Sequence, residues 1–230
     1  MKQAFWVNPW FTIPALLFIN IGLLLTLFIP QGMEIIYLNT WRQEPMNTFF
    51  RWATRLGEAW PFILIGLLGL LWRYRLTVLL IIGGLLIFLS SQALKTAVGK
   101  DRPILFFANH NLHEHVVLMP DEWPNGGRTS FPSGHTMTAF GLFGIIALLA
   151  GRQHPWIGVA CAVTAALVGV SRIFLIQHFL TDVLAGALLG LLAAGVVWVI
   201  DQRWLRRHAA LDGGLLQKPV SELPSDVVGR

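Results

Sequence analysis

Six long runs without an Asp, Glu, Lys or Arg constrain the fold of this chain more than any other feature. A helix crosses the hydrocarbon core of a bilayer with about 20 apolar residues. An open sheet cannot cross, because its edge groups would lack hydrogen-bond partners in lipid. We therefore predict an all-α, polytopic membrane protein with six transmembrane helices in a bundle. The runs are Phe11–Ile29, Ala59–Trp72, Leu76–Leu94, Phe131–Gly151, Pro155–Val170 and Val183–Ile200.

The composition supports one membrane domain. Of the 230 residues, 55% are hydrophobic and only 13% are charged, which is too apolar for a soluble domain of this size. We predict a single transmembrane domain over residues 1–207 and a polar tail over 208–230. The polar stretch begins at Asp201, and we expect it to have little fixed structure. Cys161 is the only cysteine, so no disulfide framework is possible within the chain.

The basic residues are dispersed, which disfavours nucleic acid as a partner and makes them markers of orientation instead. The net charge is +5. Cations in short turns or beside a run predict that both termini are cytoplasmic, although a raw count of Lys and Arg on the two sides is ambiguous. The predicted cytoplasmic set is Lys2, Arg73, Arg75, Arg152, Arg203, Arg206 and Arg207.

A short amphipathic helix is predicted between the first two runs. Apolar residues recur there at helical spacing, with Arg51 and Arg55 between them: Phe49, Phe50, Trp52, Ala53 and Leu56. Such a helix can lie at the membrane interface. It could guide a lipid toward a site, or it could be a structural collar, which is the simpler interpretation.

His178 and Asp182 lie between the last two apolar runs, where ionisable groups are costly and need a reason. If the segment from His178 onward is helical, the two side chains share a face and can form a hydrogen bond. A carboxylate behind one ring nitrogen would make the other a better nucleophile or base. The alternative is an ion pair that only joins two helices.

The segment Ser133-Gly134-His135 precedes an apolar run and has the residues of a helix start. Ser133 can cap the helix, and unpaired first-turn amides form an anion-binding site. In the six-helix topology this segment shares one membrane face with three cations and the His178 pair. That combination predicts a site for a phosphate, with no acidic cluster for a metal. The cations are Lys95, Arg102 and Arg172.

The loop over residues 104–131 contains three histidines, His110, His113 and His115. Three His in six residues raise the possibility of a metal site. Their spacing matches neither common zinc pattern, and no Cys is near. We interpret them as ordinary loop histidines and predict no metal.

Three spaced motifs follow one another along the chain: Lys95-x6-Arg102-Pro103, Pro132-Ser133-Gly134-His135 and Ser171-Arg172-x5-His178-x3-Asp182. Together they resemble the signature motifs of the type 2 phosphatidic acid phosphatase family, in its membrane-bound bacterial branch. Two positions depart from frequent usage in the family. Ile176 stands where Gly is often found, and Phe179 stands where Trp is common.

The resemblance implies roles for the site residues and a reaction without a metal or other cofactor. His178 would attack phosphorus to form a phosphohistidine, with Asp182 orienting it. His135 would protonate the leaving oxygen and then activate water. The phosphoryl oxygens would be held by Lys95, Arg102, Arg172, Ser133 and Gly134.

The expected function is hydrolysis of a lipid phosphate or diphosphate at the extracytoplasmic face of a bacterial cytoplasmic membrane. Among the substrates that the resemblance implies, we favour undecaprenyl diphosphate. The alternatives are phosphatidylglycerol phosphate, phosphatidic acid, diacylglycerol diphosphate and lipid A. A phosphotransferase that uses the same site is a further alternative. An anion transporter would show two related halves with interrupted helices, which the sequence lacks. An inactive lipid-binding protein is disfavoured because all the motif residues are present. The bilayer and the lipid substrate are the only partners expected.

Overall fold

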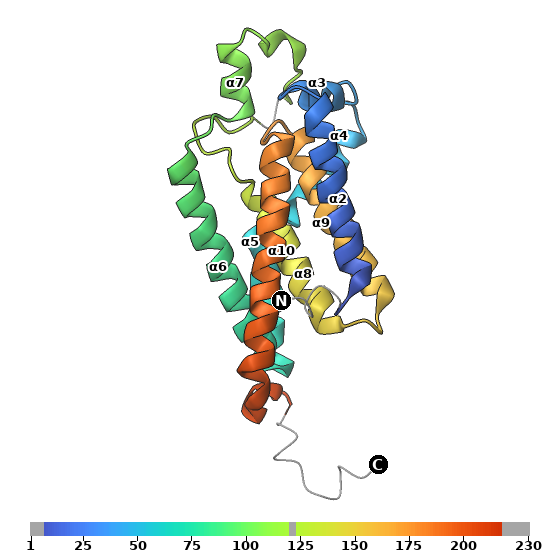
Figure 1. Cartoon of the computed structure of the whole chain (residues 1–230), viewed down its shortest axis with the longest axis vertical. Helices are drawn as coiled ribbons and strands as arrows, with labels where there is room; N and C mark the ends of the chain where they lie inside the picture. The colour runs from blue at the N-terminus through green and yellow to red at the C-terminus, as the bar shows by residue number, and fades with distance from the viewer. Residues whose placement is uncertain (1–6, 120–122, 218–230) are drawn as a thin grey trace, which may run out of the picture.

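The computed structural model describes residues 7–119 and 123–217, and the regular elements within these ranges are helices (Figure 1). This confirms the all-α prediction for the described part of the chain. The longer helices are α2 (Pro9–Phe28), α5 (Ala59–Trp72), α6 (Tyr74–Val98), α8 (Gly134–Ala150), α9 (Pro155–Phe174) and α10 (Leu180–Arg203). The shorter elements are α3 (Met33–Asn39), α4 (Met46–Arg55), α7 (Pro103–Asn109) and the 3₁₀ turns His113–His115, Leu205–Arg207 and Ala209–Asp212.

Each predicted run coincides with one of the longer helices, but fewer than six are long enough to span a membrane. Within the described ranges four segments are long and apolar enough: α2, α6 continued through α7, α9 and α10. Helices α4 and α5 form a pair bent by 48°, which gives a fifth if the pair is one span. Helices α5 and α8 have 14 and 17 residues, or about 21 and 25 Å, against a core of about 30 Å.

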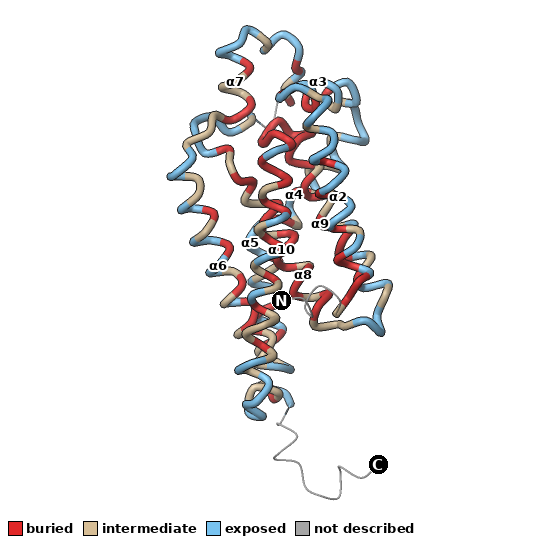
Figure 2. The backbone as a smooth tube through the Cα atoms, viewed as in Figure 1, coloured by how far each residue is buried: buried red, intermediate tan, exposed pale blue. Residues whose placement is uncertain are grey.

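The core of the molecule lies where α8, α9 and α10 meet (Figure 2). Helix α10 approaches α8 closely through Gly186 and Gly190, four residues apart on one face. A Cβ added at Gly186 would lie 2.6 Å from the Ser133 carbonyl oxygen, and one at Gly190 would lie 2.6 Å from that of Met137. Small residues at this spacing let two helix backbones touch. The contact brings the N-terminus of α8 against the first turns of α10.

The predicted short helix is present as α4, which packs on the C-terminal end of α9. Trp52 is 63% exposed, and the Arg55 guanidinium lies 4.3 Å from the centre of its ring. On the inner side the Thr54 hydroxyl accepts a hydrogen bond from Arg172 at 2.6 Å. Gly57, just beyond α4, is in close contact with His135. Helix α4 therefore forms one wall around the residues singled out in the sequence.

The expectation of little fixed structure after Asp201 is wrong for residues 201–217. Helix α10 continues to Arg203, and the following turns pack on the α5–α6 connection. The Leu215 and Leu216 amides donate to the last carbonyl groups of α5, those of Leu70 and Leu71, at 2.9 and 2.8 Å. The C-terminal carbonyls of a helix need such donors, which explains why a polar segment is ordered here. Residues 218–230 lie outside the described ranges.

Candidate active site

The turn between α9 and α10 has a defined local geometry that positions His178. The amide of Ile176 donates to the Ile173 carbonyl at 3.0 Å, and the amide of Gln177 donates to the Arg172 carbonyl at 2.9 Å. This pair of bonds is the Schellman motif, which places a left-handed residue just past the helix end. Ile176 has φ +57°, in the region where glycine is favoured. The departure from glycine noted in the sequence therefore falls on the residue that must adopt this conformation.

His178 precedes α10 instead of lying within it, so the helical geometry predicted for its pairing with Asp182 is wrong, although the two side chains lie close to each other. Helix α10 begins at Leu180, with Phe179 as N-cap. The Nδ1 atom of His178 lies 2.7 Å from the Ser130 carbonyl oxygen and 3.9 Å from Asp182 Oδ2. A carbonyl oxygen only accepts, so Nδ1 carries the hydrogen and Nε2 keeps its lone pair. The Ser130 backbone thus orients the imidazole, with Asp182 as a nearby charge.

His178 is 2% exposed, and this burial lowers the pKa of its imidazole to about 4. Desolvation disfavours the charged form of a buried His, and the Arg172 and Arg102 guanidiniums act in the same direction. The imidazole is therefore neutral at pH 7. A neutral ring with one nitrogen fixed by a carbonyl can act as a nucleophile.

Asp182 is fully buried and is a structural centre of the site. Its Oδ2 accepts hydrogen bonds from the Phe179 amide at 3.0 Å and the Ser130 hydroxyl at 2.5 Å. Its Oδ1 forms an ion pair with Lys100 Nζ at 2.7 Å. One carboxylate therefore caps α10, holds the segment before α8 and binds a lysine of the α6–α7 connection.

Two buried guanidiniums approach the site from different segments. Arg102 is 8% exposed, and Arg172 is 5% exposed. Nη1 of Arg102 donates to the side-chain oxygen of Gln177 at 3.3 Å, and its Nε donates to the Thr129 hydroxyl at 3.3 Å. Arg172 donates to Thr54 on α4, as described above. Hydrogen bonds to neutral groups hold the Arg102 guanidinium in place without cancelling its charge.

The N-terminus of α8 faces these cations. Ser133 is the N-cap, and its Oγ accepts from the Thr136 amide at 3.4 Å. The amides of Gly134 and His135 have no acceptor within the described ranges. A Cβ at Gly134 would lie 3.5 Å from Lys95 Nζ, so a lysine ammonium stands beside these free donors. His135 lies within electrostatic range of Arg172, His178, Lys95 and Arg102.

The structure thus brings together the residues singled out from the sequence, and the arrangement suits a multiply charged oxyanion. Helix N-terminal amides and several cations meet beside a neutral imidazole. The three loop histidines are not part of this arrangement: His110 Nδ1 bonds to the Phe106 carbonyl oxygen at 2.8 Å, and His113 and His115 lie in a short 3₁₀ turn. In the described part of the chain no three His, Cys, Asp or Glu residues are grouped as metal ligands.

Comparison with known protein families identifies the same part of the chain. The family model of the PAP2 superfamily matches residues 62–206, which include all eight candidate site residues. The chain belongs to the PAP2 superfamily.

Curated PAP2 relatives match over parts of their length. A lipid A 1-phosphatase of Porphyromonas gingivalis is 35% identical over 106 residues, 46% of this chain and 24% of the relative. Phosphatidylglycerophosphatase B of Bacillus subtilis is 40% identical over 81 residues, 32% of this chain and 40% of the relative. The chain therefore spans less than half the length of these curated relatives.

A solved PAP2 structure shows the same fold over most of both chains. It is the transmembrane PAP2-type phosphatidylglycerolphosphate phosphatase of Bacillus subtilis, with a TM-score of 0.60 and 25% identity. The match covers 84% of this chain and 98% of that protein. The helical fold of this chain thus resembles that of a membrane PAP2 phosphatase.

Four contacts at this PAP2 site were missed by reasoning from the sequence. They involve the Ser130 carbonyl, Lys100, Gln177 and Thr54. Lys100 and Ser130 lie within or beside the motifs, so their positions gave a weak signal. Thr54 gave none, because its segment is remote in sequence and was interpreted only as an amphipathic surface helix.

Proposed function

We propose that this PAP2 protein is a membrane phosphatase that hydrolyses a lipid phosphate or diphosphate through a phosphohistidine on His178. The observation that carries the proposal is the neutral, buried imidazole of His178, fixed at Nδ1 by the Ser130 carbonyl beside Arg102 and Arg172. Such an imidazole presents a lone pair at Nε2 to a phosphoryl group held by the cations.

In the first step the Nε2 lone pair forms a bond to phosphorus, and the bond from phosphorus to the leaving oxygen breaks. His135 gives a proton to that oxygen, which leaves as the lipid alcohol or, from a diphosphate, as the lipid monophosphate. In the second step His135 takes a proton from water, whose oxygen attacks phosphorus. The bond between nitrogen and phosphorus then breaks, which releases inorganic phosphate and restores His178.

Charge on the phosphoryl oxygens would be stabilised by protein groups in both steps. Lys95, Arg102 and Arg172 lie around the site, and the free amides of Gly134 and His135 add donors. Ser133 fixes the first turn of α8 that presents these amides. Cations on the protein would replace the metal that many phosphoryl-transfer sites use. We therefore expect turnover in the presence of a chelator.

The substrate proposed first is undecaprenyl diphosphate, with phosphatidylglycerol phosphate, phosphatidic acid and lipid A as alternatives. The names of the relatives support a lipid phosphate in general, since they include a lipid A 1-phosphatase and a phosphatidylglycerophosphatase. A phosphotransferase, in which a hydroxyl compound replaces water in the second step, is the other use of the same site.

Phosphate release by purified protein in detergent with EDTA tests this proposal. The four lipids are compared, with His178→Ala as the blank. Release from at least one lipid by the parent protein and none by His178→Ala supports the phosphatase. If the parent releases phosphate from none of them, the proposal fails, and transfer to an added acceptor is assayed next.

We further propose that the protein lies in a bacterial cytoplasmic membrane with six crossings, the site outside and both termini inside. Helices α5 and α8 would cross with the help of flanking residues. A cysteine replacing the exposed Glu114, in a background lacking Cys161, should be labelled by an impermeant reagent on intact cells. A cysteine at Arg203 should be labelled only after lysis, and the reverse pattern would invert the orientation.

A further inference from the structure

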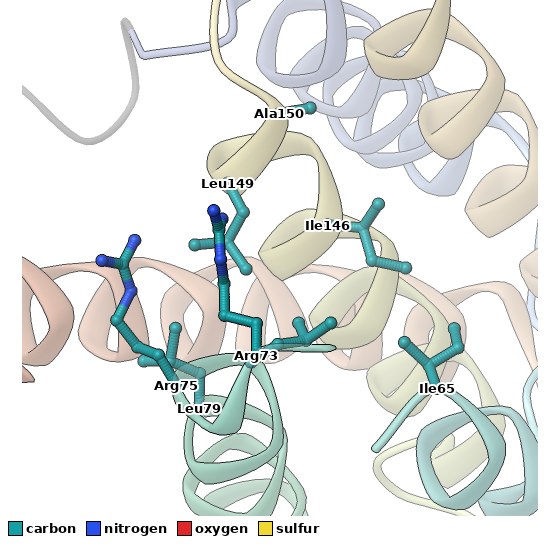
Figure 3. Close-up of a pocket in the computed structure, with 8 residues that line it drawn as sticks. Ile65, Arg73, Arg75, Leu79, Ile146, Leu149 and Ala150 are labelled. Carbon is teal, nitrogen blue, oxygen red and sulfur yellow. The ribbon is translucent and has the colours of Figure 1, made fainter. Parts of the chain in front are cut away.

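A second pocket lies at the end of the molecule opposite the candidate active site. It encloses about 340 Å³ between the α5–α6 connection and the last turns of α8 (Figure 3). Its apolar wall comes from three helices, and two arginines, Arg73 and Arg75, complete the lining. The apolar residues are Ile65, Leu76, Leu79, Ile146, Leu149 and Ala150.

The two arginines differ in how their charge is used. Arg75 forms ion pairs with Asp201 at 3.0 Å and Asp212 at 3.1 Å. The Arg73 guanidinium has no hydrogen-bond or ion-pair partner among residues 7–119 and 123–217. Figure 3 shows the Arg73 side chain extending along the pocket toward Leu149. The pocket therefore combines an apolar wall with one uncompensated cation.

The surroundings place this pocket at the level where lipid head groups would lie. Trp72, next to Arg73, is 50% exposed, and Trp204 beyond α10 is 57% exposed. Exposed tryptophans gather at the boundary between lipid tails and head groups. We propose that the pocket binds an anionic phospholipid, with its phosphate on Arg73 and part of an acyl chain against the apolar wall.

Thermal unfolding with added lipid tests this site in an inactive His178→Ala background, where no lipid can be turned over. Phosphatidylglycerol should raise Tm by about 5 °C more than phosphatidylcholine at saturating lipid. Arg73→Gln should remove most of that difference. Arg203→Gln, which removes an exposed cation at the same end of the protein, should keep it.

A variant that fills the pocket distinguishes lipid binding in the pocket from a general attraction of anionic lipid to surface charge. Ala150→Phe keeps Arg73 and occupies part of the cavity, so it should also remove the preference for phosphatidylglycerol. An unchanged preference in Arg73→Gln overturns the proposal. The proposal is also overturned if Arg73→Gln loses the preference for phosphatidylglycerol while Ala150→Phe keeps it in full. The pocket would then have no part in binding.

A separate observation, the buried carboxylate of Glu34, carries a second inference, which rests on the proposed function. Glu34 lies on α3 and is 9% exposed. Its Oε1 accepts from the Leu180 amide at 3.0 Å, and its Oε2 accepts from the Gly32 amide at 2.7 Å. Leu180 is the first residue of α10 and follows His178 by two positions.

Two consecutive amides at the start of α10 are thus bound by carboxylates. The Phe179 amide donates to Asp182 of the same helix, and the Leu180 amide donates to Glu34 from a distant segment. Such free amides are the groups that a helix start must satisfy. We infer that Glu34 is a positioning residue that fixes the turn carrying His178 against α3.

Single-turnover kinetics distinguishes positioning from a merely structural role. The amplitude of the reaction measures the fraction of folded protein, whereas the rate constant does not depend on that fraction. Glu34→Ala should lower the rate constant about tenfold to a hundredfold with its amplitude retained, since small displacements at a reacting group are costly. Glu34→Gln keeps an oxygen acceptor for the Leu180 amide, so its rate constant should lie within about threefold of that of the parent.

Glu114→Ala, at an exposed position, serves as the matched control and should leave the rate constant unchanged. If Glu34→Ala reduces only the amplitude, the residue is structural and the inference is wrong. An absence of phosphate release by the parent protein would instead count against the proposed function.

Discussion

Arg102 and Arg75, at opposite ends of the molecule, are held in opposite ways. At the site end, which carries α3 and α7 (Figure 1), Arg102 bonds to the neutral side chains of Gln177 and Thr129. At the other end Arg75 bonds to two carboxylates. A cation held by neutral groups keeps its charge for an anionic ligand, whereas one paired with carboxylates joins segments of the chain. From this comparison we expect Arg102 to bind the anionic ligand and Arg75 to stabilise the fold.

The largest expected effect is on catalysis at the site end. His178→Ala should lower phosphate release about 10⁴-fold or more, because the proposed nucleophile is removed. Circular dichroism and Tm should remain close to those of the parent. Substantial turnover by this variant would show that His178 is not the nucleophile.

The opposite end should respond in stability instead of activity. Arg75→Gln leaves the fully buried Asp201 with a 3.5 Å contact to the exposed Arg206 and a hydrogen bond from the Gln202 amide. Breaking such a pair costs about 3 kcal/mol, which thermal or denaturant unfolding in detergent can measure. The rate constant per folded molecule should be unchanged, and a tenfold loss in that constant would break the proposed division between the two ends.

Arg102→Gln tests the same division from the other side. Loss of one preorganised cation should lower kcat/KM about 10²- to 10³-fold. Its effect on stability should be smaller than that of Arg75→Gln, because its partners are neutral. A variant with normal kcat/KM and a much lower Tm would reclassify Arg102 as structural.

The pH dependence should also arise at the site end. Burial holds the pKa of His178 at about 4, below its usual value of about 6.5. The unfolded chain therefore binds a proton at higher pH than the folded one. Protonation of the unfolded chain at this position therefore lowers the free energy of unfolding by about 3 kcal/mol as pH falls from 6.5 to 4, and has no effect above pH 6.5. In His178→Ala the decline in stability between pH 6.5 and 4 should be shallower, and an identical decline would contradict this assignment.

Ile176→Gly offers the smallest and sharpest test of the turn that carries His178. Glycine would relieve about 1–2 kcal/mol of left-handed backbone strain. It would also remove a fully buried side chain packed with Ile35, Phe107 and Phe179, at a cost of about 2–5 kcal/mol. We expect a net loss of stability of about 1–3 kcal/mol by denaturant unfolding. A gain would mean that strain outweighs packing here.

The sequence by itself determined the helical class, the approximate positions of the long helices and the set of residues that the fold brings together at the candidate site. Apolar runs and three spaced motifs carry that information locally, because helix length and residue type suffice to read it. The motif order also anticipated that Lys95, His135 and His178 share one end of the bundle.

Only the tertiary structure decided how these residues are held. Ser130 orients His178, Lys100 neutralises Asp182, and Thr54 on the amphipathic helix bonds to Arg172. The ordering of residues 201–217 against α5 was likewise decided by contacts. The physical reason is the same in each case: a hydrogen-bond partner many residues away leaves no periodic trace, so it is fixed only when the helices pack.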